Sequence, residues 1–152
     1  METSLSIALQ KAKHYCAYQE RCHKEVREKL YSFQLYKKDV EQLLTQLIEE
    51  DFLNEERFAL AFARGRFNLK KWGKEKIKYE LKQKQVSEYC IRKALNSIDT
   101  SNYNKTFISL ASNKLKTLKS EKNIFIKKKK IKAFLQQKGF EPKMIYAYLN
   151  DI

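Results

Sequence analysis

One pattern occurs three times along this chain of 152 residues, and it limits the possible folds more than any other feature. The three copies begin at Glu25, Lys76 and Lys130 and align without a gap. They read EVREKLYSFQLYKKDVEQLLTQL (25–47), KIKYELKQKQVSEYCIRKALNSI (76–98) and KIKAFLQQKGFEPKMIYAYLNDI (130–152). Repetition at this spacing indicates an array of small structural units that share a core.

The apolar positions of the three copies agree and describe two helices joined by a short break. The first two positions are spaced i, i+4 and the last three i, i+4, i+7, which is typical of one face of a helix. A single apolar residue lies in the break between them. The matched sets are Val26, Ile77 and Ile131; Leu30, Leu81 and Leu135; Leu35, Val86 and Phe140; Val40, Ile91 and Ile145; Leu44, Leu95 and Leu149; and Leu47, Ile98 and Ile152.

A further helical stripe precedes each copy, so each unit should contain three helices. Ser4, Asn54 and Ser87 are candidate N-caps, and Pro142 suits the first turn of the last helix. We therefore predict an all-α fold of three tandem three-helix repeats that form an elongated, curved array. The predicted ranges are 1–53, 54–99 and 100–152, and units of this size need each other for stability.

The composition agrees with helices and indicates an anionic partner. Three glycines and one proline are too few for an all-β fold or a Gly-rich phosphate loop. The net charge is +14, and its distribution is uneven: residues 1–55 carry −2, residues 56–100 carry +7 and residues 101–152 carry +9. An excess of this size favours nucleic acid as the partner, although basic residues can also serve solubility alone.

The strongest candidate for a binding surface is a row of cations on the second helix of the second unit. Lys74, Lys78 and Lys82 are spaced i, i+4, i+8 beside the buried stripe of that helix. Such a row can neutralise phosphates without reading sequence, although it can also be an ordinary solvated face. Further members of the candidate surface are Arg64, Arg66, Lys70, Lys71, Lys128 and Lys132.

Two other features each allow two interpretations. The run Lys127–Lys130 is either a nucleic-acid-binding patch or the solvent-exposed first turn of a helix, where four cations would oppose the helix dipole. Trp72 lies among basic residues before Gly73, so it can stack on a base or, as we favour, anchor the corner between two helices.

No residue set indicates catalysis or a metal. His14, Cys16, Cys22 and His23 are zinc ligands by type, but their spacing matches no common finger. No nucleophile–base set, metalloprotease motif or Walker loop occurs, so we expect a protein that is not an enzyme and needs no cofactor or metal. Three sparse cysteines and the lack of a long apolar run favour a cytoplasmic protein without a membrane partner.

Three stretches have the character of family signatures. The most specific are Asp51-Phe52-Leu53-Asn54-Glu55-Glu56-Arg57-Phe58-Ala59, at the join of units one and two, and residues 72–86, WGKEKIKYELKQKQV. The third comprises Ala8-Leu9 and Gln19-Glu20-Arg21-Cys22. The first two resemble central signatures of the RecX regulatory protein family, and the third resembles the opening of that family. Gln34 and Gln85 depart from the usual glycine, Lys74 from proline and Cys22 from serine, and glutamine accepts positive φ poorly.

The resemblance implies a regulator that binds the RecA recombinase and its filaments on DNA. It implies inhibition of strand exchange, ATP hydrolysis and the coprotease function, hence a role in DNA repair, recombination and the SOS response. Arg57, within the first signature, joins the basic residues above as a candidate contact for RecA or for the phosphates of single- and double-stranded DNA. We expect a monomer. The alternative is a general nucleic-acid-binding helical protein that needs no RecA.

Overall fold

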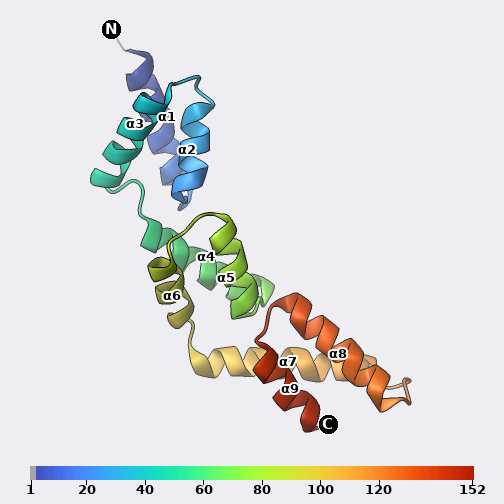
Figure 1. Ribbon diagram of the computed structural model, residues 1–152. Helices are drawn as coiled ribbons and strands as arrows, with labels where there is room; N and C mark the ends of the chain where they lie inside the picture. The colour runs from blue at the N-terminus through green and yellow to red at the C-terminus, as the bar shows by residue number, and fades with distance from the viewer. Residues whose placement is uncertain (1–2) are drawn as a thin grey trace. The chain divides into compact units, whose positions relative to one another are not determined.

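The computed structural model describes residues 3–152, and within that range the chain forms nine α-helices and no strand (Figure 1). The all-α prediction is therefore confirmed. The helices are α1 (Ser4–Tyr18), α2 (His23–Tyr31), α3 (Lys37–Glu49), α4 (Glu55–Lys70), α5 (Lys74–Gln83), α6 (Glu88–Asn96), α7 (Thr100–Thr117), α8 (Ile124–Lys138) and α9 (Pro142–Asn150).

The helix boundaries follow the sequence repeat. The helices α3, α6 and α9 begin at Lys37, Glu88 and Pro142, which occupy the same position in the three copies. The helices α2 and α5 begin at His23 and Lys74, in each case two residues before the copy of the repeat begins. The helix α8 begins at Ile124, about one turn earlier than the repeat predicts. The repeat plan is thus present in the backbone.

The break between the second and third helix of each repeat contains one residue in the left-handed conformation. These residues occupy the same position of the repeat: Gln34 has φ 63°, Gln85 has φ 61° and Gly139 has φ 93°. After Gln85 and Gly139, the amide of the next residue satisfies a carbonyl at the end of the helix. Val86 N–H donates to the Leu81 carbonyl, and Phe140 N–H donates to the Leu135 carbonyl. The two glutamines therefore adopt the geometry for which glycine is suited.

The predicted apolar stripes form the interior. Fifteen of the eighteen matched positions are buried, and Leu35, Leu95 and Ile152 are partly exposed. Leu30, Leu81 and Leu135, on the second helix of each repeat, are fully inaccessible to solvent. Burial of these side chains supplies most of the stability of helices that are too short to persist alone.

The helix starts are mostly as predicted. The side chain of Asn54 accepts from Arg57 N–H at 2.9 Å, Ser87 accepts from Cys90 N–H at 3.3 Å, and Pro142 opens α9. The prediction of Ser4 as the first cap was wrong by one residue, because Thr3 accepts from Ser6 N–H. These side chains satisfy amides that have no partner within the helix.

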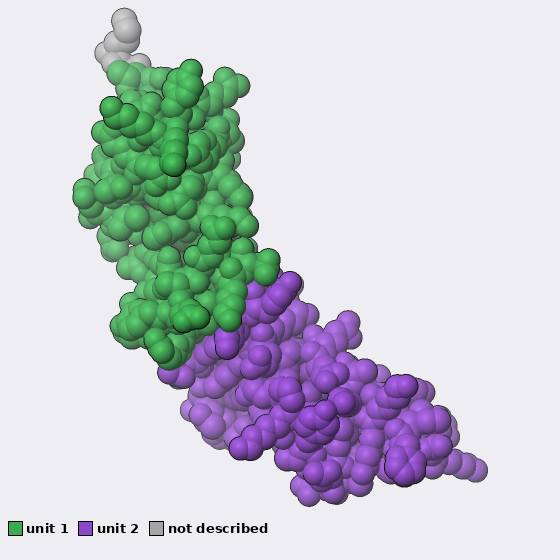
Figure 2. Space-filling model, viewed as in Figure 1, with its two compact units in different colours: residues 1–62, 81–94 green, residues 63–80, 95–152 purple. Residues whose placement is uncertain are grey.

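The contacts divide the chain into two compact units (Figure 2). Unit 1 comprises residues 1–62 and 81–94, and unit 2 comprises residues 63–80 and 95–152. The predicted repeat ranges 1–53, 54–99 and 100–152 each hold three helices, and their boundaries stay a prediction.

The two units have different cores. In unit 1 the helices α1, α2 and α3 enclose a mainly aliphatic cluster: Ala8, Ala12, Cys16, Val26, Leu30, Val40, Leu43, Leu44, Leu47 and Leu53. Unit 2 has a series of aromatic contacts. The ring centroid of Phe140 lies 5.4 Å from that of Tyr103 and 5.2 Å from that of Phe107. Such ring pairs add directional packing to the burial of apolar area.

No helix within residues 3–152 combines the length and the hydropathy that a membrane crossing requires.

Candidate nucleic-acid interface

Almost the whole net charge of the chain belongs to unit 2. Residues 63–80 and 95–152 contain 19 Lys and Arg and 6 Asp and Glu, which gives +13. Residues 1–62 and 81–94 contain 13 basic and 12 acidic residues, which gives +1. A charge of +13 on one compact unit creates a strong attraction for polyanions.

Five of the thirteen Lys and Arg residues of unit 1 form ion pairs with carboxylates. Arg27 Nε lies 2.7 Å from Glu41 Oε1, and Lys93 Nζ lies 3.1 Å from Glu56 Oε1. Beyond Lys93, the described part of the chain contains no ion pair between a basic side chain and a carboxylate. The cations of α7, α8 and α9 thus keep their charge available for an external anion.

Arg57 belongs to this internally paired set. Its Nε lies 2.7 Å from Glu20 Oε1, its Nη1 lies 3.2 Å from Asp51 Oδ1, and its Nη2 donates to the Asp51 carbonyl. The hydrogen bond to Glu20 raises the pKa of the Arg57 guanidinium above its usual range. The guanidinium therefore ties the end of α1 and the α3–α4 turn to α4, and its place in a partner interface stays a prediction.

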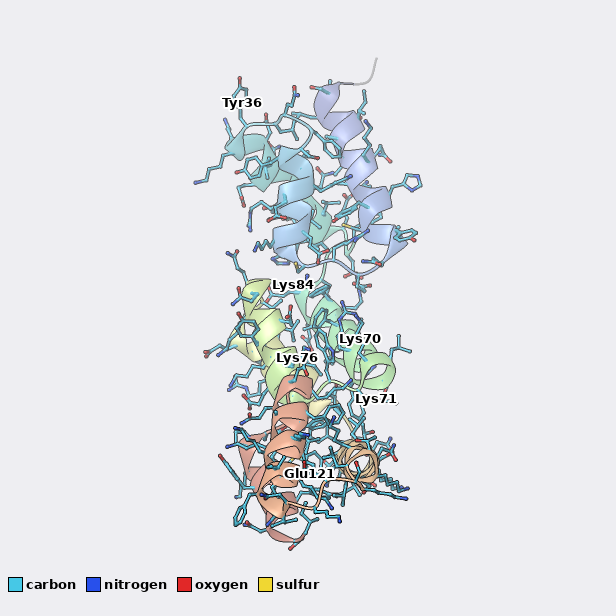
Figure 3. The ribbon with its side chains drawn as sticks, turned by 90° about the vertical axis from the view of Figure 1, so that its right-hand side faces the viewer. Tyr36, Lys70, Lys71, Lys76, Lys84 and Glu121 are labelled. Atoms are coloured by element: carbon cyan, nitrogen blue, oxygen red, sulfur yellow. The ribbon has the colours of Figure 1, made fainter. Side chains whose placement is uncertain are left out.

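Several cations gather around Trp72, at the corner between α4 and α5. The ring of Trp72 is half-buried, and Arg66 Cζ, Lys70 Nζ and Lys76 Nζ lie 5.5, 5.7 and 4.5 Å from its centroid. Figure 3 labels Lys70 and Lys71 at the end of α4 and Lys76 on α5. Each cation is attracted to the ring face, so Trp72 holds the cations of this corner together.

The corner is built by the docking of α5 onto the end of α8. Gly73 N–H donates to the Lys138 carbonyl at 2.7 Å, and Glu75 N–H donates to the Gly139 carbonyl at 2.9 Å. Amides at the start of one helix thus satisfy carbonyls at the end of another, an arrangement that the helix dipoles also favour. The same docking brings Lys76 Nζ within 3.4 Å of the Gln137 carbonyl.

A buried tyrosine fixes the first residue of α5. The hydroxyl of Tyr103, on α7, accepts from Lys74 N–H at 2.9 Å and donates to Glu141 at the start of α9. Burial, reinforced by the hydrogen bond to Glu141, raises the pKa of Tyr103, so the phenol stays protonated. Lys74 Nζ lies 4.9 Å from the centroid of the same ring, so Lys74 is turned toward the fold and is half-buried.

A small hollow lies between the end of α4 and α7. It has a volume of about 220 Å³ and is lined by Lys71, Lys105, Thr106, Ser109 and Leu110. Two ammonium groups and two hydroxyls around a hollow of this size are suited to the oxygens of a phosphate.

The remaining predicted residues lie apart from this corner. Arg64 on α4, and Lys78 and Lys82 on α5, are exposed, as a solvated face requires. Lys132 Nζ lies 5.0 Å from the ring centroid of Tyr146, on the side of α8 that faces α9, and Lys128 is one turn earlier. The candidate residues therefore form separate groups along α4, α5 and α8.

Lys76 and Lys105 belong to the cationic groups and were missed from the sequence. Lys76 heads the second repeat copy, but only the docking of α5 on α8 brings it to Trp72. Lys105 and Lys71 line the same hollow although they are far apart in sequence, so no spacing pattern could have indicated that Lys105 belongs to the site.

The run Lys127–Lys130 lies in the first turns of a well-capped helix. Asn123 accepts from Phe125 N–H at 2.9 Å and from Ile126 N–H at 3.3 Å, and α8 begins at Ile124. Lys129 and Lys130 are exposed, whereas Lys127 and Lys128 are half-buried. Both interpretations of this run remain open.

The cysteines are free and buried. Burial raises the pKa of Cys22 to about 11, so this thiol stays protonated. Over the described range, no cluster of His, Cys, Asp and Glu is arranged to hold a metal ion, and this includes His14, Cys16, Cys22 and His23.

Known proteins of one family share this architecture. The family model for the second three-helix domain of RecX matches residues 54–95, and the model for the third three-helix domain matches residues 103–149. The crystal structure of RecX from Lactobacillus salivarius has a TM-score of 0.84 and 28% identity, with 98% of each chain covered.

Curated sequences agree with these matches. Regulatory protein RecX of Chlorobium phaeobacteroides is 31% identical over 133 residues, which cover 88% of this chain and 85% of that protein. Regulatory protein RecX of Clostridium perfringens strain 13 is 33% identical over 122 residues, or 80% of this chain and 57% of that protein. The chain spans little more than half the length of such clostridial relatives. Because the helical repeats, both domain models and these similarities coincide, the chain belongs to the RecX family of regulatory proteins.

Proposed function

We propose that this protein binds RecA and RecA–DNA filaments and inhibits the recombinase, ATPase and coprotease activities of RecA. It would thereby regulate recombination, DNA repair and the SOS response in the cytoplasm, as a monomer. Membership of the RecX family supports a regulatory role, and the family resemblance supplies RecA as the partner.

The observation that carries the DNA part of this proposal is the charge of unit 2. Its net charge of +13, with no ion pair in the described chain after Lys93, leaves many cations free to replace the counterions of a phosphate backbone. The cations around Trp72 and the hollow at Lys71 and Lys105 would contact phosphates. Such contacts position a protein on DNA without sequence preference.

The direct test is inhibition of the DNA-dependent ATPase of RecA on single-stranded DNA. The test variant combines Lys74→Gln, Lys78→Gln and Lys82→Gln, which neutralise the row on α5. The matched control combines Lys37→Gln, Lys38→Gln and Arg92→Gln, which remove three exposed cations of unit 1. We expect half-inhibition by the α5 variant to require at least about tenfold more protein, because each lost phosphate contact weakens binding. Each lost contact should also lower the slope of log affinity against log salt concentration by about one.

The outcomes separate the candidate functions. Wild-type protein that fails to inhibit RecA at any concentration contradicts the filament-regulator proposal. Binding to bare DNA without any effect on RecA supports the general nucleic-acid-binding alternative. An α5 variant that is folded and inhibits like the wild type shows that the row on α5 is only a solvated face.

A further inference from the structure

A groove between α1 and α2 is unlike the rest of the nearly neutral unit 1. It has a volume of about 600 Å³ and is open to solvent. Its walls are lined by Lys11, His14, Tyr15, Tyr18, Arg21, Lys29 and Phe33. Three permanent cations and three aromatic rings thus face one cavity, and none of the described residues that line it is acidic.

The cations and rings of the groove are interleaved. Arg21 Cζ lies 3.7 Å from the ring centroid of Tyr15, and Lys29 Nζ lies 5.3 Å from the same centroid. Lys11 and Lys29 flank the ring of Phe33 at 5.6 and 5.8 Å. These contacts hold the charged groups over the aromatic rings, instead of leaving them free to point away from the groove.

The carboxylates of unit 1 leave most of this charge uncompensated. Arg21 Nη1 lies 3.8 Å from Glu25 Oε2, and Arg21 Nε donates to the Tyr15 carbonyl at 3.0 Å, so the Arg21 guanidinium is fixed in place. Lys11 and Lys29 are exposed, and the structure shows no ion pair for either within the described range. Tyr18 is 83% exposed at the rim. The groove therefore offers positive charge together with the exposed ring of Tyr18.

We propose that this groove binds a short stretch of single-stranded nucleic acid, with bases stacked on its aromatic side chains and phosphates held by Lys11, Arg21 and Lys29. Aromatic surfaces lined with cations are the means by which proteins bind single strands without sequence preference. A duplex is a poorer ligand, because its bases are already stacked and paired. This site is separate from the phosphate-binding surface of unit 2 and does not depend on RecA.

The test compares three fluorescein-labelled ligands of equal length by anisotropy: an oligothymidylate, the same strand with abasic sugars, and a duplex. The abasic strand retains the phosphates and lacks the bases, so the difference between it and the oligothymidylate measures stacking. We expect the wild-type protein to bind the oligothymidylate at least about fivefold more tightly than the abasic strand.

The groove variant combines Tyr18→Ala, Lys11→Gln and Lys29→Gln, all at exposed positions. It should bind oligothymidylate and abasic strand almost equally. The matched control combines Tyr36→Ala, Lys37→Gln and Lys38→Gln; Tyr36 is 84% exposed and lies outside the groove. The control should keep the preference for bases.

Three results would overturn the proposal. The first is equal binding of the two strands by the wild type, and the second is an unchanged preference in the folded groove variant. The third is binding of fluorescein-labelled polyglutamate to the wild type at least as tightly as the oligothymidylate, with loss of that binding in the groove variant, which would indicate an acidic protein segment as the occupant. Loss of cations from unit 2 should weaken the binding of the duplex most and leave the preference for the oligothymidylate over the abasic strand, so failure of the phosphate-binding proposal is distinguishable.

Discussion

A β-carbon on Gly73 would overlap the carbonyl group of Gly139, so the backbones of these two glycines are in direct contact. This contact permits Gly73 N–H to reach the Lys138 carbonyl and Glu75 N–H to reach the Gly139 carbonyl. The closeness depends on both glycines, because a β-carbon on Gly139 would overlap the β-carbon of Lys76. The placement of the cations around Trp72 therefore rests on two residues without side chains.

The first prediction is that Gly73→Ala destabilises unit 2. The added methyl group meets backbone atoms, which cannot rotate away, so we expect a loss of about 1–3 kcal/mol in the free energy of unfolding. Gly65→Ala is the control, because among the described residues nothing lies within 4 Å of a β-carbon there. This control should stabilise α4 by about 0.5–1 kcal/mol. Urea unfolding followed by circular dichroism measures both, and equal effects of the two substitutions would contradict the docking geometry.

The second prediction concerns the turn residue that the repeats share. Gln85 has φ 61°, a conformation that costs a residue with a β-carbon about 1–2 kcal/mol. Gln85→Gly should raise the free energy of unfolding by up to about 1 kcal/mol, since the gain exceeds the added entropy of the unfolded chain. Gln34→Gly should act in the same way.

The control for these substitutions is Gln42→Gly, in the interior of α3, which should destabilise by about 1 kcal/mol. Thermal unfolding of the three variants provides the comparison. A loss of stability in Gln85→Gly would show that the side chain of Gln85 contributes more than its backbone strain costs.

The third prediction is that Tyr103→Phe loosens the start of α5. The substitution keeps the ring contacts but removes the hydroxyl that joins Lys74 N–H to Glu141. We expect a loss of about 1–3 kcal/mol in the free energy of unfolding, because a part-buried amide and a carboxylate each lose a partner. Tyr79→Phe, at a position that is 60% exposed, should change stability by less than about 0.5 kcal/mol. Hydrogen exchange at the amides of α5 should rise in Tyr103→Phe and remain unchanged in Tyr79→Phe.

The fourth prediction is a loss of stability in mildly acidic solution that originates at His23. Burial lowers the pKa of His23, and this outweighs the opposite effect of Glu55, whose Oε2 lies 3.7 Å from His23 Nδ1. The unfolded chain therefore binds a proton more readily than the folded chain as the pH falls below about 6.5. Protonation thus favours unfolding, and the thermal midpoint should fall between about pH 7.5 and about pH 5.5.

His23→Gln should reduce that fall, whereas His14→Gln, on the exposed side of α1, should not. At lower pH a further loss is expected from Glu55. Burial acts to raise the pKa of that carboxyl, but the hydrogen bonds from Ser87 and Cys90 and the nearby His23 together lower it. Thermal midpoints measured by circular dichroism at both pH values check the direction of the change in stability. Greater stability at the lower pH would contradict it.

The sequence by itself determined the helices and the interior. Val26, Ile77 and Ile131 could be identified as buried, and all three are fully inaccessible to solvent. Helix periodicity depends on neighbours three or four residues away, so the pattern is complete within each segment. The recurrence of the pattern in three copies then indicated a helical repeat without any knowledge of contacts.

The tertiary structure decided which charges are available and where they gather. Arg57 and Lys76 are alike in the sequence as cations near a helix start, yet Arg57 is bound by Glu20 and Asp51 while Lys76 lies over Trp72. Lys71 and Lys105 meet at one hollow from helices that the sequence separates. Whether a cation faces a carboxylate, a ring or solvent depends on residues that are distant along the chain. Only the packing of whole helices, such as α5 on the end of α8, brings those residues within the few ångströms over which such interactions act.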